Sequence, residues 1–390
     1  MAIHKVKGDY RLDLELYRPL TNYGLLGSGS RPKVSQMKLD DIKIHKVIDK
    51  GRERLYLEAR YEGESGWGEI HVGRPSWDMD EITSALKTVG DYLTSIEWEK
   101  PPELIDNLWK RLMKYRLDWG KGAISRLLSG VDQAVYDLYG KVKDEPLYRV
   151  LGGEEAIDIP IYVAIEGAEV SRETLNRWMD IGVAEFKVIL TGDLEKDIKI
   201  VHQVSDILDE PILVDADMAY TQEEALSLMK EAGEDIKWFE DPVYMDDIGS
   251  LDMVKRIAIM NFDEMVVAGG ERIYDKFDML RLFEKYRLID VYITDITRNG
   301  GLKTAIDVGD IAAKNKVGFS PYVSGSIYSL YGSIHLALSR PDVRYIGVYG
   351  GSGGLDPGEL VDLVNDGVIP AGEILNDVVG IGPYIGDLVS

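Results

Sequence analysis

The sequence predicts an α/β protein with a closed parallel barrel of eight strands, preceded by a separate α+β unit. Three observations lead to this fold class. Short β-rich runs alternate with amphipathic, helix-favouring stretches from residue 159 onward, the runs recur at a nearly constant spacing, and the first 130 residues do not share that spacing. We therefore expect an α+β unit at 1–130, the barrel at 131–349, and a C-terminal segment at 350–390 that packs back on the first unit.

The barrel is predicted from its period. The β-rich runs begin at residues 159, 185, 212, 238, 265, 290, 317 and 344, and successive starts differ by 25 to 27 residues. That distance is the length of one strand, one helix and two short loops. The stretches between the runs, such as 193–208 and 301–316, repeat apolar residues at helical spacing and carry charges on the other face. Eight such equal units favour a closed barrel over a doubly wound sheet, which ranks second.

The first 130 residues contain strands followed by helices. Strand-like runs cover 41–50, 52–63 and 66–72, and helical runs cover 80–96, 102–115 and 123–142. This segregation is typical of an α+β unit. The glycine- and serine-containing stretch 25–31 is interpreted as a mobile loop.

Composition and charge exclude several classes of function. The 390 residues include 45 Lys and Arg against 68 Asp and Glu, and the net charge of −23 argues against nucleic-acid and anionic-membrane partners. The absence of cysteine excludes disulfides, thiolate metal sites and cysteine nucleophiles. No apolar run is long enough for a membrane span, and the polar start lacks the apolar core of a signal peptide, so a cytoplasmic location is expected.

Three acids follow three successive predicted strands, at the ends where barrels of this type place functional groups. Asp215 ends the third run, Glu240 the fourth, and Glu271 follows the fifth. Carboxylates that share one mouth repel one another unless a cation joins them. A single acid is usually a solvated loop residue, but three at matched strand ends favour a metal site. Oxygen ligands favour Mg²⁺ over Zn²⁺ at such a site.

Two further ionisable residues end predicted strands. Lys187 ends the second run, and Asp295 ends the sixth. A lysine near a metal-bound anion can pair with the substrate or, with its pKa depressed by the cation, act as a base. A lysine that merely buries its aliphatic stem is an equal alternative. Asp295 is either an orienting acid or a cap for the turn at Gly300 and Gly301.

Six short motifs occur in a characteristic order. They are Gly66-Trp67-Gly68-Glu69, Val131-Asp132-Gln133-Ala134, Asp137-Leu138-Tyr139-Gly140-Lys141, Leu151-Gly152-Gly153, Trp238-Phe239-Glu240-Asp241-Pro242, and Asp295 followed by Gly300-Gly301. In this order and spacing, over nearly the whole chain, they resemble the enolase superfamily, specifically its mandelate racemase and sugar-acid dehydratase branch.

The resemblance implies a (β/α)₇β modified TIM barrel under a capping domain built from both chain ends. It also implies Mg²⁺ on Asp215, Glu240 and Glu271, a small-molecule carboxylate substrate, and a homo-oligomer. Loops near 23–31 and 74–77 would close the site. The candidate substrate contacts are Tyr23, Arg31, His71, Trp77 and Arg298.

Departures from the branch fall on the proton-transfer residues. The branch has a second lysine on strand two, a histidine on strand seven and a glutamate on strand eight, where this chain has Ile189, Tyr322 and Gly347. Asp217 stands at a position that is often asparagine. None of the five histidines is expected to restore the missing pairing with Asp295.

This altered set favours chemistry on one face of the substrate. Lys187 is the leading candidate for the base that removes the proton beside the substrate carboxylate, with Asp217 second. Tyr322, beside Asp295, either gives a proton to a leaving hydroxyl or packs against the substrate.

Racemisation needs a competent group on each face, so the sequence favours elimination. The predicted activity is that of a Mg²⁺-dependent lyase, a dehydratase that converts an aldonate or uronate to a 2-keto-3-deoxy acid. The alternatives are an epimerase, racemase or cycloisomerase on the same metal platform, and a noncatalytic homologue.

Overall fold

The computed structural model describes residues 36–49, 51–72, 77–115, 120–283, 287–340, 342–375, 378–382 and 385. All of them belong to one compact unit that begins at Gln36. The predicted loop 25–31, the loop 74–76 and the candidate contacts Tyr23 and Arg31 lie outside the described residues. Trp77 is described only by its backbone, at the start of a helix.

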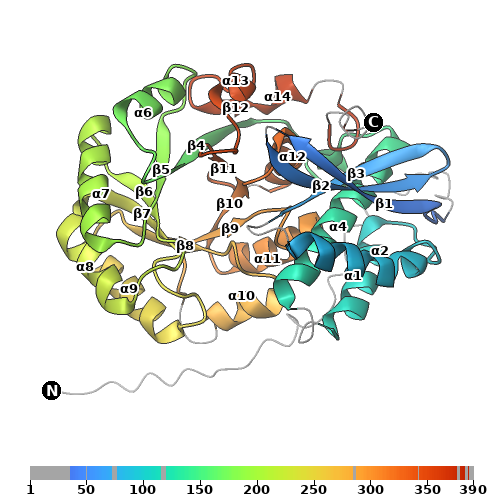
Figure 1. The fold of residues 1–390 in the computed structure, drawn as a ribbon, viewed down its shortest axis with the longest axis horizontal. Coiled ribbons are helices and arrows are strands. Elements are labelled where there is room, and N and C mark those ends of the chain that lie inside the picture. Colours follow the sequence, from blue (N-terminus) through green and yellow to red (C-terminus); the bar gives the residue numbers. More distant parts are fainter. Residues whose placement is uncertain are drawn as a thin grey trace. The chain divides into compact units, whose positions relative to one another are not determined.

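Eight parallel strands close into a barrel, because the last strand pairs with the first (Figure 1). Each strand begins within two residues of its predicted start. The strands are β4 Asp158–Glu166, β5 Glu185–Ile189, β6 Ile212–Asp215, β7 Ile236–Glu240, β8 Val266–Gly269, β9 Val291–Thr294, β10 Gly318–Val323 and β11 Ile346–Tyr349. The predicted α/β barrel is therefore confirmed.

Helices cover the outside of the barrel. They are α6 Arg172–Met179, α7 Leu194–Leu208, α8 Gln222–Ala232 with the 3₁₀ turn η2 Gly233–Asp235, α9 Ile248–Asn261, α10 Lys276–Phe283, α11 Gly301–Lys314 and α12 Ile327–Leu338. Five of them begin after a polar residue whose side chain accepts a hydrogen bond from the first turn. Such N-caps satisfy backbone groups that have no partner within the helix, which fixes where each helix starts.

The described part of the cap contains an antiparallel sheet and helices, as predicted for an α+β unit. The sheet has the order β1 Asp41–Asp49, β2 Arg52–Tyr61 and β3 Glu64–Ile70, and the helices are α1 Trp77–Leu93, α2 Pro101–Met113 and α4 Lys121–Lys143. Strand β3 lies directly on α4. A Cβ atom at Gly66 would stand 2.1 Å from the carbonyl oxygen of Ala134, so this approach requires glycine.

The C-terminal segment adds α13 Pro357–Leu360, β12 Val368–Pro370 and α14 Ala371–Ile374. Strand β12 pairs antiparallel with the start of β4, and the backbone N–H of Ile381 donates to Asp137 Oδ1 at 2.8 Å. The short helix α5 Leu147–Val150 lies beside this segment, bonded to it through Gly380. Asp137 lies on α4 of the cap, and Gly353 of the C-terminal segment lies against Arg52 of β2, while β12 pairs with the barrel. The return of this segment to the first unit stays a prediction. The boundaries at 130 and 349 stay predictions.

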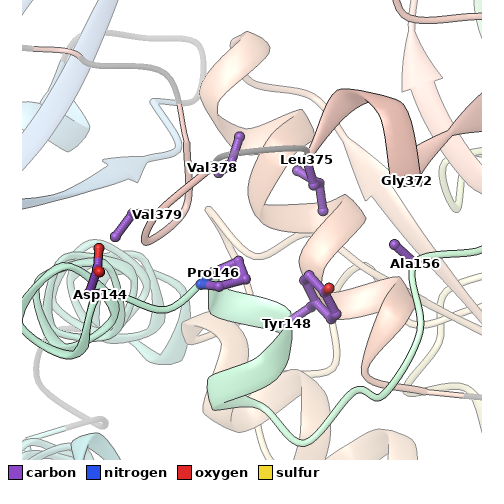
Figure 2. Close-up of a pocket in the computed structure, with 8 residues that line it drawn as sticks. All are labelled: Asp144, Pro146, Tyr148, Ala156, Gly372, Leu375, Val378 and Val379. Atoms are coloured by element: carbon purple, nitrogen blue, oxygen red, sulfur yellow. The ribbon is translucent and has the colours of Figure 1, made fainter.

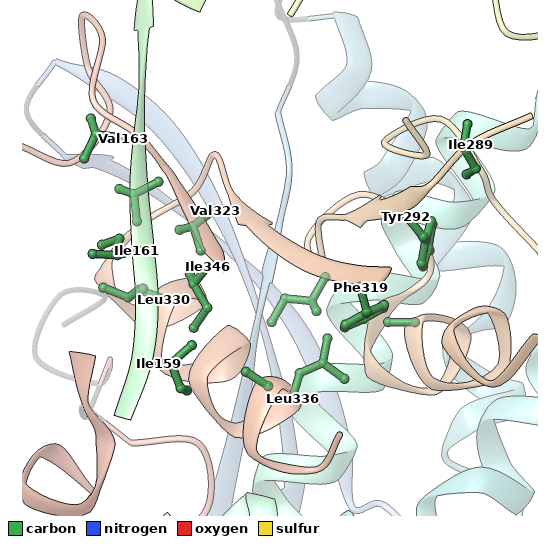
Figure 3. Close-up of a cluster of buried hydrophobic side chains, with 14 of the residues drawn as sticks. Ile159, Ile161, Val163, Ile289, Tyr292, Phe319, Val323, Leu330, Leu336 and Ile346 are labelled. Atoms are coloured by element: carbon green, nitrogen blue, oxygen red, sulfur yellow. The ribbon is translucent and has the colours of Figure 1, made fainter. Parts of the chain in front are cut away.

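Side chains on the barrel strands alternate between two apolar layers. Figure 3 shows part of the outer layer, in which Ile161 of β4 and Ile346 of β11 lie near Leu330 of α12. The adjacent Tyr162 of β4 belongs instead to the cluster inside the barrel. Within the described ranges, the helices are too short or too polar to cross a lipid bilayer.

Candidate functional site

The three predicted metal ligands lie at the carboxyl ends of β6, β7 and β8. Asp215 and Glu240 are the last residues of β6 and β7 and stand opposite each other in the sheet register, while Glu271 follows β8. Their exposed fractions are 6%, 1% and 8%. Burying an unpaired carboxylate costs several kcal/mol, so these acids require cationic partners.

Lys187 supplies the positive charge beside Asp215 and Glu240. It lies in the middle of β5 and not, as predicted, at the strand end. Its side chain is fully buried, and Nζ lies 3.1 Å from Asp215 Oδ2 and 2.8 Å from Glu240 Oε2. Burial alone would lower the pKa of Lys187, but the two carboxylates outweigh it and hold that pKa well above its usual value. Burial also raises the pKa of Glu240 to about 7, despite the attraction of Lys187. Lys187 is therefore an ammonium ion that balances both acids.

Aromatic side chains enclose this ion pair. Nζ of Lys187 lies 4.6 Å from the ring centroid of Tyr322 and 5.4 Å from that of Tyr162, distances at which a ring face attracts a cation. Trp238 Nε1 donates a hydrogen bond of 3.1 Å to Glu240 Oε2. Burial raises the pKa of Tyr322 well above its usual value, so its phenol keeps its proton and can only act as a donor of it.

Gly347 marks a close contact inside the barrel. It stands opposite Tyr162 in the register of β11 and β4, and a Cβ atom at this position would lie 2.2 Å from Cζ of the Tyr162 ring. The ring of Tyr162 thus occupies the space into which a glutamate at residue 347 would project. The glycine at residue 347, where the branch has a glutamate, is thus explained by the Tyr162 ring on the neighbouring strand β4.

The third acid, Glu271, is paired outside this cluster. Its carboxylate accepts from Nη1 of Arg298, and Nη2 of Arg298 lies 2.9 Å from Nε2 of His71. Burial and the charge of Arg126 lower the pKa of Arg298 to about 10, which still leaves the guanidinium charged at neutral pH. The structure thus brings the candidate substrate contacts His71 and Arg298 together.

Asp295 is completely buried, and its carboxylate accepts four hydrogen bonds. Oδ1 accepts from the backbone N–H of Thr297 at 2.7 Å and its hydroxyl at 2.6 Å, and Oδ2 accepts from the backbone N–H and hydroxyl of Ser324. Four donors stabilise the ionised form although burial raises the pKa of Asp295. These bonds favour the prediction of Asp295 as an orienting acid, while the turn at Gly300 is held by Ser129 Oγ, which accepts from the Gly300 N–H at 2.9 Å.

Asp217 lies at the rim. Its side chain is 55% exposed, and Oδ1 lies 2.7 Å from Nη2 of Arg272. Its backbone N–H donates to Asp215 Oδ1 at 2.9 Å, and its φ of 43° places it in the left-handed region, so the chain turns sharply after β6. This carboxylate is the most exposed of the predicted site acids.

The donor set fits a hard divalent cation in chemistry and in burial. Asp215, Glu240 and Glu271 offer only oxygen, and two of them already share one cation, the Lys187 ammonium. In the described part of the chain, no three His, Asp or Glu side chains stand close enough to hold a metal as they are placed, and Glu271 is turned to Arg298. Binding of one ion at all three acids therefore requires these side chains to move closer together.

Sequence reasoning missed Ser324 and Tyr162. The carboxylate of Asp295 is bonded to Thr297 and Ser324, and His71 reaches it only through Ser324. Ser324 Oγ bridges Asp295 Oδ2 and His71 Nδ1, the latter at 3.1 Å. Ser324 comes two residues after Tyr322 at the same strand end, which is the signal that could have found it. For Tyr162 the signal was a glycine within a buried strand.

A surface hollow of about 440 Å³ lies elsewhere, between the end of α4, helix α5 and the C-terminal segment. Figure 2 shows its lining, which includes Pro146, Tyr148 and Leu375. Among the described residues that line it, Asp144 is the one carboxylate, in contrast to the three acids at the strand ends.

Comparisons with known proteins agree with this geometry. A family model described as enolase C-terminal domain-like matches residues 170–369, more than half of the chain. The arabinonate dehydratase of Saccharolobus solfataricus is 29% identical over 264 residues, which cover 65% of this chain and 69% of that protein. The 3,6-anhydro-alpha-L-galactonate cycloisomerase of Streptomyces coelicolor is 26% identical over 258 residues, covering 64% and 68%.

A solved structure of a racemase from Streptomyces coelicolor with bound magnesium has the same fold, with a TM-score of 0.74 and 20% identity over 90% of this chain and 99% of that one. From the family model, and from the barrel, the cap and the acids at the strand ends, we conclude that this chain belongs to the enolase superfamily.

Proposed function

We propose that this protein is a Mg²⁺-dependent sugar-acid dehydratase that removes water from an aldonate or uronate to give a 2-keto-3-deoxy acid. The observation that carries the proposal is the group of three buried carboxylates at the ends of β6, β7 and β8 beside Lys187. Asp215, Glu240 and Glu271 would hold Mg²⁺, which would stabilise negative charge as it develops on the substrate carboxylate. The relative named arabinonate dehydratase supports this reaction class.

Three side chains are candidates for the proton-transfer steps: Lys187, Asp217 and Tyr322. Lys187 holds positive charge against Asp215 and Glu240 and, in the arrangement described here, is protonated. It can serve as the base only after it loses its proton, whereas Asp217, the second candidate, is a solvent-exposed carboxylate that pairs with Arg272. Tyr322 retains its phenolic proton and can deliver it to a leaving hydroxyl.

A second candidate reaction is cycloisomerisation or epimerisation on the same acids, favoured by the relative named as a cycloisomerase. Such a reaction returns a proton without loss of water. In deuterated solvent the recovered substrate or its isomer would then gain deuterium, and its mass would show no loss of water. A third candidate, a noncatalytic homologue, predicts that sugar acids bind and are not turned over at any pH.

The test is a screen of aldonic and uronic acids with Mg²⁺, in which 2-keto-3-deoxy products are measured. We expect at least one acid to lose water, and this turnover should disappear on chelation of the metal. A screen in which no acid yields a 2-keto-3-deoxy product would contradict the proposed function. A carboxylate small molecule as partner, and a homo-oligomeric state, are part of the same proposal.

A further inference from the structure

His71 stands where the cap meets the barrel mouth. It follows β3, and its backbone N–H donates to the carbonyl of Thr297 at 3.0 Å. Nearby, Gln133 of α4 donates to the carbonyls of Glu69 and Ile296 at 2.9 and 3.0 Å. These bonds anchor the end of β3 to the loop after β9, so the imidazole of His71 is held against Ser324 and Arg298.

The partners of His71 fix which ring nitrogen carries the proton. A guanidinium only donates hydrogen bonds, so Nε2 of His71 must accept from Arg298. The hydroxyl proton of Ser324 is given to Asp295 Oδ2, so Ser324 Oγ must accept from His71 Nδ1. Both constraints require a neutral imidazole protonated on Nδ1. Burial and the charge of Arg298 agree with this form, since they hold the pKa of His71 well below its usual value.

The result is one directional chain of hydrogen bonds between two buried acids. The chain runs from Nη2 of Arg298 through His71 and Ser324 to Asp295. Nη1 of Arg298 donates to Glu271. Asp295 is immobilised by its four donors, so it orients Ser324, which orients His71. The lone pair of His71 Nε2 then determines where the guanidinium of Arg298 stands.

We propose that His71 is a positioning residue, contributed by the cap, that aims Arg298 at Glu271 and at an incoming carboxylate substrate. When Glu271 turns to a cation, the bond from Arg298 to His71 keeps the guanidinium at the mouth, free to pair with a substrate carboxylate. The part that concerns substrate rests on the proposed function, whereas the tautomer of His71 does not.

The tautomer is tested first, in the metal-free protein, by long-range ¹H–¹⁵N correlation spectra of a sample labelled at histidine. Loss of one signal set in His71→Gln assigns the ring. We expect Nδ1 to be protonated and Nε2 bare, and Arg298→Met should perturb Nε2. An Nε2-protonated ring or an imidazolium would overturn the proposal. This measurement needs no substrate, so its outcome is independent of whether the proposed reaction is found.

Kinetics on the substrate from the screen then separate positioning from proton transfer. Glutamine can accept from Arg298 and donate to Ser324 but cannot take up a proton, so His71→Gln should stay within a few fold of the wild type. His71→Ala should lower kcat/KM by about 10- to 100-fold, mainly by raising KM, because Arg298 loses the hydrogen-bond acceptor that fixes its position. The matched control is His45→Ala, since His45 is a cap histidine bonded to Glu58 at 2.9 Å, away from this chain of bonds, and should leave both constants unchanged.

Two outcomes would overturn the proposal. If His71→Ala matched the wild type, the histidine would have no role at the site. If His71→Gln lost kcat as severely as His71→Ala with KM unchanged, the imidazole would itself exchange a proton with substrate.

Discussion

The two halves of the barrel mouth are built on different principles. The acid half, formed by Asp215, Glu240 and Glu271 at β6 to β8, is held by full charges on Lys187 and Arg298. The relay half, formed by Asp295 and Ser324 at β9 and β10, is held by hydrogen bonds that extend to His71 in the cap. The carboxylates of the acid half can exchange one cationic partner for another. The hydrogen bonds of the relay half form only when the cap is in place.

The largest effect is expected when the acid half loses a ligand. Glu240→Gln should abolish measurable Mg²⁺ binding in calorimetry, a loss of at least about 100-fold in affinity, because a neutral amide replaces a buried anionic ligand. Circular dichroism should show the barrel intact. Glu231→Gln on the exposed surface of α8 is the matched control and should bind Mg²⁺ like the wild type. Unchanged affinity in Glu240→Gln would remove the premise of a metal site at these strands.

The next effect concerns charge balance in the acid half. Lys187→Met removes the cation between Asp215 and Glu240, and without metal the free energy of unfolding should fall by about 3 to 5 kcal/mol, as for other broken buried ion pairs. Urea denaturation measures the change, and Mg²⁺ should restore more stability to this variant than to the wild type. Lys230→Met, at an 81% exposed lysine, serves as the control. Equal stability of the two variants would show that Lys187 does not balance these acids.

Tyr322 lies at the border between the two halves. If its phenol delivers a proton, Tyr322→Phe should lower kcat by about 100-fold while leaving KM nearly unchanged, since one general acid contributes factors of this size. The phenylalanine ring keeps the contact with the Lys187 ammonium, so stability should change little. A kcat equal to that of the wild type would assign Tyr322 to packing.

The smallest effect tests the steric fit between Gly347 and Tyr162. Gly347→Ala should destabilise the protein by about 1 to 3 kcal/mol, because its Cβ meets the tyrosine ring. Adding Tyr162→Leu makes room, so the double variant should be less destabilised than the sum of the two single variants. Gly249→Ala on α9, where the nearest atom would be 3.6 Å away, is the control. Strict additivity would mean that the two residues do not share this space.

The same contrast explains what could be predicted from the sequence. The strands and the acid half were accessible because each barrel unit repeats with a nearly constant length and places its acid at its own strand end. The relay half was not, because His71 and Ser324 are 253 positions apart and meet only through docking of the cap. The burial of Lys187 under two tyrosine rings likewise depends on packing between strands, which a motif does not encode.

Helix α4 has a mechanical consequence for the whole molecule. The amide of Gln133 donates to carbonyl groups of β3, of α4 itself and of the loop after β9, while glycines let β3 rest on the helix backbone. Separating the cap from the barrel at this helix would therefore expose buried amide and carbonyl groups. Such a joint transmits unfolding from one side to the other, so calorimetry should record a single heat-absorption peak rather than one for each part.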